Sequence, residues 1–325
     1  MKEMTDKSAI KLLAEQIEKH AFRRGCVSAF TLAAFPVKKN EELAIHITRE
    51  CEGLIYGNAE VGSPEAFKAC IDALDGRTDY IFWDTGLYPD VFNPGLPRSF
   101  PVLKSSVLLS YDDQDVWTES VKYILMTLVP DLRIKKALVI SSFNNPEFTN
   151  RLLNDLRFNL GETSVLKSGD SFTAFTGIDI IIGAAIYEQV ITRELIGAID
   201  GNPLIVDAGI GTLTPSATSY AHENGLSVIR VDNRAAMAGT LFSLIQSYDL
   251  VTRVMGSGEI DGVRVVAGGI VGKPGDIIVD SIDSPSVVIG IADGTGKVRY
   301  LPENEEERVT LEKVKAAISE RRSNE

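Results

Sequence analysis

Cysteine and histidine, the residues that most often build metal centres and disulfide frameworks, are scarce in this chain. Its 325 residues include only three of each, and these are scattered along the sequence: Cys26, Cys51, Cys70, His20, His46 and His222. They form no CxxC pair and show no spacing typical of a zinc site. We therefore expect reduced thiols rather than a catalytic cysteine, no metal site, and a cytoplasmic location.

Long apolar runs and an excess of positive charge are also missing. No uncharged apolar run approaches the roughly 18 residues of a membrane span, and Met1 to Lys7 are polar where a signal peptide would lead into an apolar stretch. The formal net charge is -12, which argues against nucleic acid or an anionic membrane as partner because both require clustered Lys and Arg. A small-molecule substrate is the expected partner, and a small basic pocket for a phosphate is still compatible with this charge.

The composition is that of an ordinary globular protein, with 44% hydrophobic and 24% charged residues. A length of 325 residues suggests two domains, or one domain with an extension. We predict an N-terminal α/β substrate domain over residues 1–131 and a Rossmann-like nucleotide-binding domain over 132–256. A β-rich extension with a C-terminal helix follows over 257–325, and we expect it to serve in a homo-oligomer, such as a homodimer.

Short apolar runs alternate with helical stretches in the central part of the chain. Five runs have the length and composition of buried strands: 136–142, 164–167, 178–183, 203–207 and 226–231. The alternation predicts an α/β fold with a doubly wound parallel sheet, covered by helices on both faces. Ligands of such sheets bind beyond the carboxyl ends of the strands, so the residues that follow each run are the first candidates for a site.

The N-terminal part carries signals for three helices, predicted over residues 5–24, 64–74 and 112–129. Residues 26–35 fit either a strand or a buried loop, and 41–50 fit either a strand or a helix.

A proline-rich segment from Tyr88 to Pro101 is long enough to be a structured, functional loop. It follows a predicted buried strand, residues 79–84, whose exit carries Asp84. Because a general acid or base acts from a closed cleft, Asp84 and Lys104, on either side of the loop, are candidates for proton transfer.

The C-terminal part has four short strand-like runs, the last two joined by the turn signal Asp293 to Gly296. The glycine-rich stretch 268–275 lacks the spacing of a phosphate-binding loop, and we predict that it is a hairpin connection. A charged helix is expected over 305–322.

The turn after the first central strand contains no glycine. Dinucleotide-binding sheets usually place G-x-G-x-x-G there, because glycine lets the backbone approach a pyrophosphate. This chain has Ser141, Ser142, Asn144 and Asn145 instead. Either these side chains bind a phosphate or carboxylate together with the N–H groups of the next helix, or Asn145 simply caps that helix. The missing glycines weaken the case for ordinary NAD binding.

The other strand exits each allow two interpretations. Lys167 would suit a 2′-phosphate or a solvated loop, and Gly183 with Ala184 would admit a ring or ribose, or simply pack tightly. Asp207 would face the crevice as a catalytic carboxylate, with Gly209 beside the cofactor, or Asp207 would cap its own turn. At the last exit, Asp232 and Arg234 could pair with each other and do nothing else.

Three segments resemble the nucleotide-binding domain of the methylenetetrahydrofolate dehydrogenase/cyclohydrolase family: Lys135 to Ile140, Gly177 to Ala185, and Pro203 to Gly211. A later segment, Gly225 to Met255, is similar to the shikimate dehydrogenase branch of the same amino-acid-dehydrogenase-like superfamily. The resemblance covers about a third of the chain. It implies a Rossmann-like domain and an NAD(P) cofactor, although the family's Gly-Arg-Ser turn is absent here.

The leading hypothesis is an NAD(P)-dependent oxidoreductase that acts on a small polar metabolite at an interdomain cleft. A group-transfer enzyme on the same scaffold, for example one that uses S-adenosylmethionine, is the main alternative because that ligand has no pyrophosphate to bind. A third possibility is a non-catalytic binding protein that has kept the fold and lost the dinucleotide site.

Overall fold

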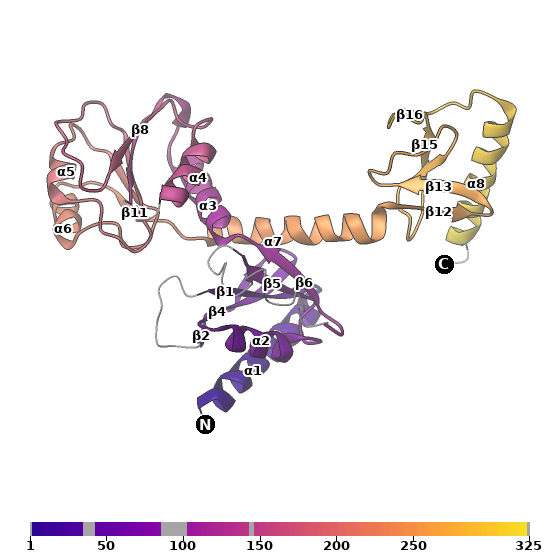
Figure 1. Ribbon diagram of the computed structural model, residues 1–325, viewed down its shortest axis with the longest axis horizontal. Helices are drawn as coiled ribbons and strands as arrows, with labels where there is room; N and C mark the ends of the chain where they lie inside the picture. The colour runs from indigo at the N-terminus through magenta and orange to yellow at the C-terminus, as the bar shows by residue number, and fades with distance from the viewer. Residues whose placement is uncertain (1, 35–42, 86–102, 143–145, 324–325) are drawn as a thin grey trace. The chain divides into compact units, whose positions relative to one another are not determined.

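The computed structural model describes residues 2–34, 43–85, 103–142 and 146–323. Its contacts divide the chain into two compact units, unit 1 (Met1–Thr240) and unit 2 (Leu241–Glu325). Unit 1 contains two sheets and unit 2 contains one (Figure 1). The first sheet lies within residues 1–131 and the second within 132–256, whereas the third begins at Gly256, one residue before the expected extension. The expected boundaries after residues 131 and 256 stay predictions.

The first sheet is largely parallel, with the order β2-β4-β1-β5-β6 and with β3 also paired to β4. Its central strands β4, β1, β5 and β6 are parallel, and β2 and β3 run antiparallel to β4. The strands are β1 (Val27–Ala34), β2 (Leu43–Ile45), β3 (Arg49–Cys51), β4 (Leu54–Val61), β5 (Tyr80–Asp84) and β6 (Val107–Tyr111). In their described parts, the ambiguous segment 26–35 therefore forms one strand and the ambiguous segment 41–50 contributes to two short strands.

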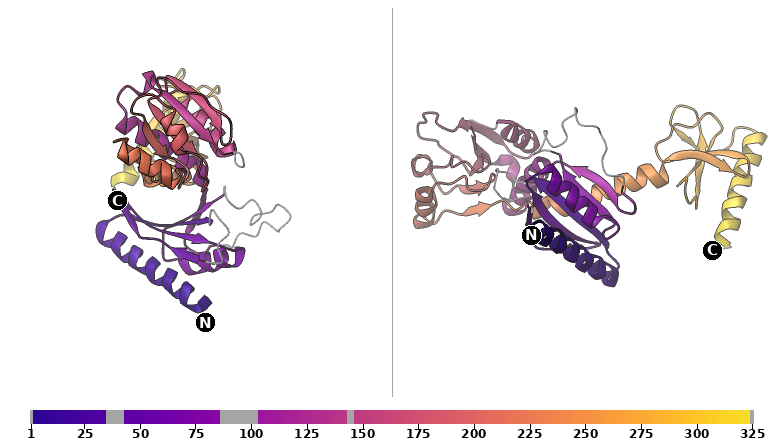
Figure 2. Two further views of the ribbon diagram at one scale, coloured as in Figure 1. Left: turned by 90° about the vertical axis from the view of Figure 1, so that its left-hand side faces the viewer. Right: turned by 60° about the horizontal axis from the view of Figure 1, so that its bottom comes forward.

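Helices α1 (Lys2–Arg24) and α2 (Pro64–Leu74) cover one face of this sheet. Ile17 of α1 and Ile71 of α2 are fully buried with Phe30 of β1 in a single apolar cluster. Figure 2 shows α1, in indigo, lying along the strands. The start of α2 is as predicted, because the Ser63 hydroxyl accepts the Ala66 N–H at 3.1 Å.

The second sheet confirms the expected doubly wound parallel arrangement. Its order is β11-β10-β9-β7-β8, and every pair is parallel. The strands are β7 (Lys136–Ser141), β8 (Glu162–Lys167), β9 (Ile180–Ala184), β10 (Leu204–Asp207) and β11 (Val228–Arg230). No helix joins β8 to β9 in this fully described stretch. The sheet changes winding direction at β7 and β9, where such folds place a ligand.

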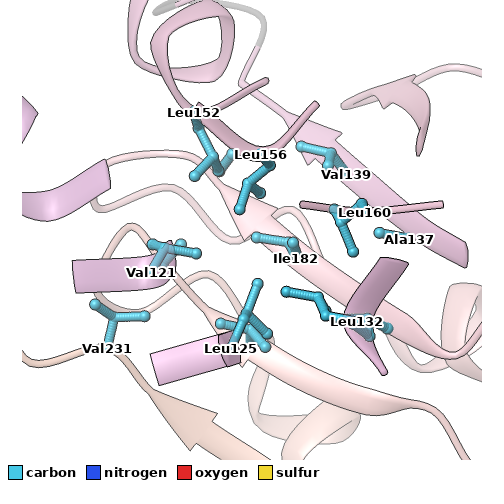
Figure 3. Close-up of a cluster of buried hydrophobic side chains, with 14 of the residues drawn as sticks. Val121, Leu125, Leu132, Ala137, Val139, Leu152, Leu156, Leu160, Ile182 and Val231 are labelled. Atoms are coloured by element: carbon cyan, nitrogen blue, oxygen red, sulfur yellow. The ribbon is translucent and has the colours of Figure 1, made fainter. Parts of the chain in front are cut away.

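Helices cover both faces of the second sheet. On one face lie α3 (Asp113–Leu128) and α4 (Pro146–Leu156), and on the other α5 (Arg193–Gly197) and α6 (Pro215–Glu223). Alternation along β7 supplies both cores, since Val139 belongs to the first cluster and Leu138 to the second. Figure 3 shows the first cluster, in which Leu125 of α3 and Leu156 of α4 approach Ile182 of β9.

Unit 2 is β-rich, as expected. After α7 (Arg234–Asp249), which begins in unit 1, and a π-helical turn (Leu250–Val254), a sheet forms in the order β12-β13-β14-β15-β16. The strands are β12 (Gly256–Ile260), β13 (Val263–Ala267), β14 (Ile277–Val279), β15 (Val288–Ala292) and β16 (Val298–Arg299), and α8 (Glu305–Ser323) packs on them (Figure 1).

One prediction for unit 2 is confirmed and one is wrong. The turn from Asp293 to Gly296 joins the antiparallel strands β15 and β16, as a hairpin does. The glycine-rich stretch 268–275 is not a hairpin connection, because the strands it joins, β13 and β14, are parallel. Within the described residues, no helix has the length and apolar character needed to cross a membrane.

The core around β9 should dominate the stability of unit 1. Both tryptophans of the chain, Trp83 and Trp117, lie in unit 1, so their fluorescence follows its unfolding separately from unit 2. Ile182→Ala removes a fully buried side chain and should lower the free energy of unfolding by about 2–5 kcal/mol, measured by denaturant titration. The matched control Ile134→Ala, at a side chain 75% exposed, should change it by less than about 0.5 kcal/mol. Equal effects of the two variants would contradict this core.

Candidate active site

A pocket in unit 1 lies where strands of both parallel sheets end. Its cavity volume is about 110 Å³, roughly the space of four water molecules, which suits a single ring or small group better than a whole dinucleotide. The lining residues come from β1 and β4 (Ala33, Asn58, Glu60), from α3 and α4 (Asp113, Gln114, Trp117, Phe148), and from the turns after β9, β10 and β11 (Ile186, Tyr187, Ala208, Gly209, Ile210, Asn233).

Asp113 is the lining residue whose position is most closely controlled. It is the first residue of α3 and follows β6 directly after the N-cap Asp112. The Asp113 backbone N–H donates to the carboxylate of Asp84, at the end of the neighbouring strand β5, over 3.0 Å. The indole N–H of Trp117, one helical turn later, donates to the Asp113 carboxylate over 2.9 Å. These two bonds fix the main chain and the side chain of Asp113.

The environment of Asp113 favours a protonated carboxyl. Burial raises its pKa most, the negative charges of Asp84, Asp112 and Glu60 also raise it, and the net result is a pKa of about 7 in place of 3.8. The Trp117 N–H lowers the pKa, as the positive end of the helix dipole should, but burial and the neighbouring carboxylates outweigh them. A carboxyl group with a pKa near 7 can both give and accept a proton at neutral pH.

A buried tyrosine lies beside this pair of acids. Tyr111 pairs with Asp84 across β5 and β6, and burial raises the pKa of its phenol well above the usual value of 10. Its hydroxyl is buried without a hydrogen-bond partner among the described residues. Such an orphaned hydroxyl is uncommon in a folded protein, and it marks the sheet edge behind Asp113 as specialised.

Two further lining residues adopt strained backbone conformations. Tyr187, after β9, has φ 54°, and Ile210, after β10, has φ 63°. A left-handed conformation is unfavourable for a bulky or β-branched residue and costs on the order of 1–3 kcal/mol. The Tyr187 N–H donates to the Gly209 carbonyl at 3.0 Å, which ties the two turns together. Strain held at two adjacent turns of a pocket is typical of a functional site.

Among the predicted catalytic residues, Asp84 lies nearest the pocket chemistry. It does not line the cavity but holds the Asp113 backbone from behind. Asp207 also lies outside the lining, and its carboxylate accepts from the Gly211 N–H at 2.7 Å and the Thr212 hydroxyl at 2.9 Å. These contacts agree with the alternative that Asp207 caps its own turn. Lys104 precedes β6 and so lies at the opposite, amino-terminal edge of the first sheet, where its N–H donates to Asp75.

The predicted cofactor residues are only partly brought together. Gly209 lines the pocket, and any side chain there would meet the Ala185 carbonyl at 2.0 Å. Gly183 and Ala184 are buried in β9, and a side chain at Gly183 would collide with Thr212. Close packing therefore accounts for the glycines at both positions.

The serine turn and Lys167 lie apart from the pocket lining. Ser141 is the buried last residue of β7, and the Ser142 hydroxyl donates to the carboxylate of Glu188. Lys167 ends β8 and is exposed. Asn144 and Asn145 fall outside the described residues, and their predicted roles stay predictions.

The alternative that Asp232 and Arg234 pair with each other agrees with the structure. The Arg234 Nε donates to the Asp232 carboxylate at 2.7 Å. Asn233 between them faces the pocket instead, and its amide oxygen accepts from Arg49 at 3.3 Å.

Four lining residues were not predicted from the sequence: Asp113, Glu60, Trp117 and Tyr187. Asp113 had a usable signal, because Val107-Leu-Leu followed by acids and a helix start is another strand exit. Tyr187 had none, since nothing in its neighbours indicates a left-handed backbone. Among the described residues, no group of three or more His, Cys, Asp or Glu side chains is placed to hold a metal ion.

Comparison with known proteins gives a remote resemblance. No family model matches the chain, and no curated protein matches it. Similar solved structures include the bifunctional FolD methylenetetrahydrofolate dehydrogenase/cyclohydrolase from Campylobacter jejuni, at TM-score 0.39 and 14% identity, covering 74% of this chain and 96% of that one. Another is the Trypanosoma brucei N5,N10-methylenetetrahydrofolate dehydrogenase-cyclohydrolase complexed with NADP cofactor and an inhibitor, at TM-score 0.39 and 12% identity, covering 74% and 95%. The resemblance expected from the sequence is confirmed as a remote one.

The raised pKa of Asp113 should make the stability of unit 1 depend on pH. In the unfolded chain the carboxyl ionises near its ordinary 3.8, whereas in the folded chain it stays protonated up to about 7. Between these values the folded state binds more protons, so the free energy of unfolding contributed by Asp113 falls as the pH rises. Asp113→Asn has no carboxyl to titrate at this position. Its free energy of unfolding, relative to that of the wild type, should therefore rise by on the order of 2 kcal/mol from pH 5 to pH 8.

Urea unfolding followed by tryptophan fluorescence at the two pH values measures this gain. The control Asp72→Asn, at an exposed position of α2, should differ from the wild type equally at both. A constant difference for Asp113→Asn as well would show that Asp113 titrates normally.

Proposed function

We propose that this chain is an enzyme that moves a proton to or from a small polar metabolite bound in the pocket of unit 1. The observation that carries the proposal is Asp113, a lining carboxyl whose pKa is raised by burial to about 7. General acid–base catalysis is most effective when the pKa of the catalytic group lies near the working pH.

The orientation of Asp113 supports this role. Trp117 occupies one oxygen of the carboxyl, Oδ2, through its indole N–H, so the second oxygen is the one to exchange a proton with the metabolite. Asp84 holds the backbone under the same carboxyl and acts as a positioning residue. Fixed orientation of this kind reduces the entropy that the reaction must overcome.

The shape and lining of the pocket support a small ligand with a flat part. Trp117, Tyr187 and Phe148 supply aromatic surface, and Ala208 with Gly209 leaves a wall without bulky side chains. Asn58 and Asn233 add polar groups at the same cavity. A mostly apolar cavity with a few convergent polar groups is typical of a small-molecule site.

The specific reaction to test first is the NAD(P)-dependent oxidation or reduction of this metabolite in the cleft between the two expected domains. A nicotinamide cofactor would supply the hydride that accompanies the proton. Ala208 and Gly209 fit the ring end of such a cofactor, but Glu188 occupies the Ser142 hydroxyl that a phosphate would need. The residues present therefore fit the ring and not the phosphates. This mismatch keeps the S-adenosylmethionine alternative open, since that ligand carries no phosphate.

Glu188 offers a direct test of the dinucleotide proposal. If a phosphate lies over Ser142, Glu188→Gln removes a like charge and should tighten NADPH binding by roughly tenfold. NADPH, NADH and S-adenosylmethionine would each be titrated in a thermal-shift assay, because a ligand of the folded state raises the melting temperature. The control Glu223→Gln removes an equal charge at an exposed position of α6 and should change nothing.

Each outcome bears on a different part of the proposal. Stabilisation by NADPH that grows in Glu188→Gln supports the oxidoreductase. Stabilisation by S-adenosylmethionine alone overturns it in favour of group transfer. Asp113→Asn should show the same thermal shift with NADPH as the wild type. Its turnover of the carbonyl compounds that the wild type reduces should be slower by roughly 10²–10⁴-fold. Unchanged turnover would remove Asp113 from the chemistry.

A further inference from the structure

We propose, on the basis of the function above, that the metabolite is a cation that carries N–H donors on a flat frame, such as an amidinium or a protonated amine beside a ring. Three independent features of the pocket support this class of ligand: its charge, an unused hydrogen-bond acceptor and its aromatic surface.

The lining is negatively charged above the pKa of Asp113, which is about 7. Glu60 and Asp113 are the ionisable acids that face the cavity, and among its described lining residues there is no lysine or arginine. Arg49 reaches the site only through Asn233, whose amide oxygen it occupies. His46 pairs with Glu60 at 3.5 Å but does not line the cavity. In a cavity of low dielectric, this charge favours a cationic ligand and opposes an anionic one.

The hydrogen-bonding groups of the pocket include an unused acceptor. The amide oxygen of Gln114 is buried and has no donor among the described residues. Asn58 also lines the cavity, and one N–H of its amide donates to the Thr31 hydroxyl at 2.7 Å. A buried acceptor without a donor destabilises the folded protein. A ligand with several N–H groups would remove that destabilisation, whereas a phosphate or carboxylate would add further acceptors.

The aromatic residues complete the match. Trp117 and Tyr187 face the same cavity as the two acids, and aromatic faces attract cations, guanidinium and ammonium groups among them. The volume of about 110 Å³ compares with the roughly 150 Å³ of a cavity that holds benzene. One ring with its charged substituent toward the acids would therefore fill the pocket, with the rest of the ligand outside it.

Three probes of nearly equal shape separate charge from size: benzamidine, which is a cation with N–H donors, benzamide, which is neutral, and benzoate, which is an anion. Binding to the full chain would be measured at pH 8 by ligand-observed NMR titration. We expect benzamidine to bind at least tenfold more tightly than benzamide, and benzoate not to bind. Equal affinities, a preference for benzoate, or no binding of benzamidine would each overturn the proposal.

Variants locate the binding in the pocket. Glu60→Gln removes one charge, and Gln114→Met removes the unused acceptor at constant length; each should weaken benzamidine by roughly tenfold. Glu223→Gln, which removes an equal charge outside the pocket, should leave the affinity unchanged. If Glu60→Gln and Glu223→Gln weaken benzamidine equally, benzamidine is responding to the overall net charge of -12, and the proposal fails.

A fourth probe, 1-methylnicotinamide, tests whether the pocket binds the metabolite or the cationic ring of an oxidised nicotinamide cofactor. It is a flat cation whose charged nitrogen has no N–H, so it should bind more weakly than benzamidine. Tighter binding of 1-methylnicotinamide would assign the pocket to the ring of an oxidised cofactor and overturn the proposal. The proton-transfer function fails separately, if the stability of unit 1 lacks the pH dependence expected from Asp113. If that pH dependence is found but benzoate binds, only the proposed class of ligand is refuted.

Discussion

The hydrogen bond from the Asp113 backbone N–H to the Asp84 carboxylate connects the fold to the chemistry of the site. It joins the end of β5 to the first turn of α3, so the strand and the helix start hold a second acid next to the first. Burial disfavours the charged form of Asp113, and the negative charge of Asp84 disfavours it further. The result is a group whose pKa of about 7 follows from its position and from no special chemistry of its own.

The parallel sheets supply the rest of the pocket. Parallel strands direct their carboxyl ends to one edge, and helices or turns begin there with free N–H groups and little side-chain bulk. In this chain the edge of the first sheet contributes acids and the edge of the second contributes small and strained residues. A proton-transfer group and a wall against which a flat ligand can lie thus come from different sheets of unit 1.

The sequence predicts the second sheet well and the site only in part. Apolar runs such as 136–142 and 203–207 have one compatible environment, a strand buried on both faces, so their positions and parallel pairing followed from pattern alone. Gly209 and Asn233 were within the predicted strand exits. Asp113 also follows a strand closely, but the contact with Asp84 that distinguishes it joins residues 29 positions apart along the chain, which no local pattern indicates. Asp207 looks catalytic in sequence, yet its hydrogen bonds to Gly211 and Thr212 are visible only in the fold.

The protonation of Asp113 is the claim on which the proposed function depends. Carbon-13 NMR of the Asp113 side-chain carboxyl, assigned by comparison with Asp113→Asn and titrated from pH 3 to pH 9, measures it directly. A midpoint near 7 is the predicted result, with burial and the charge of Asp84 as its cause. A midpoint near 4, the value of an ordinary solvated aspartate, would contradict it and leave the pocket without a proton-transfer group at neutral pH.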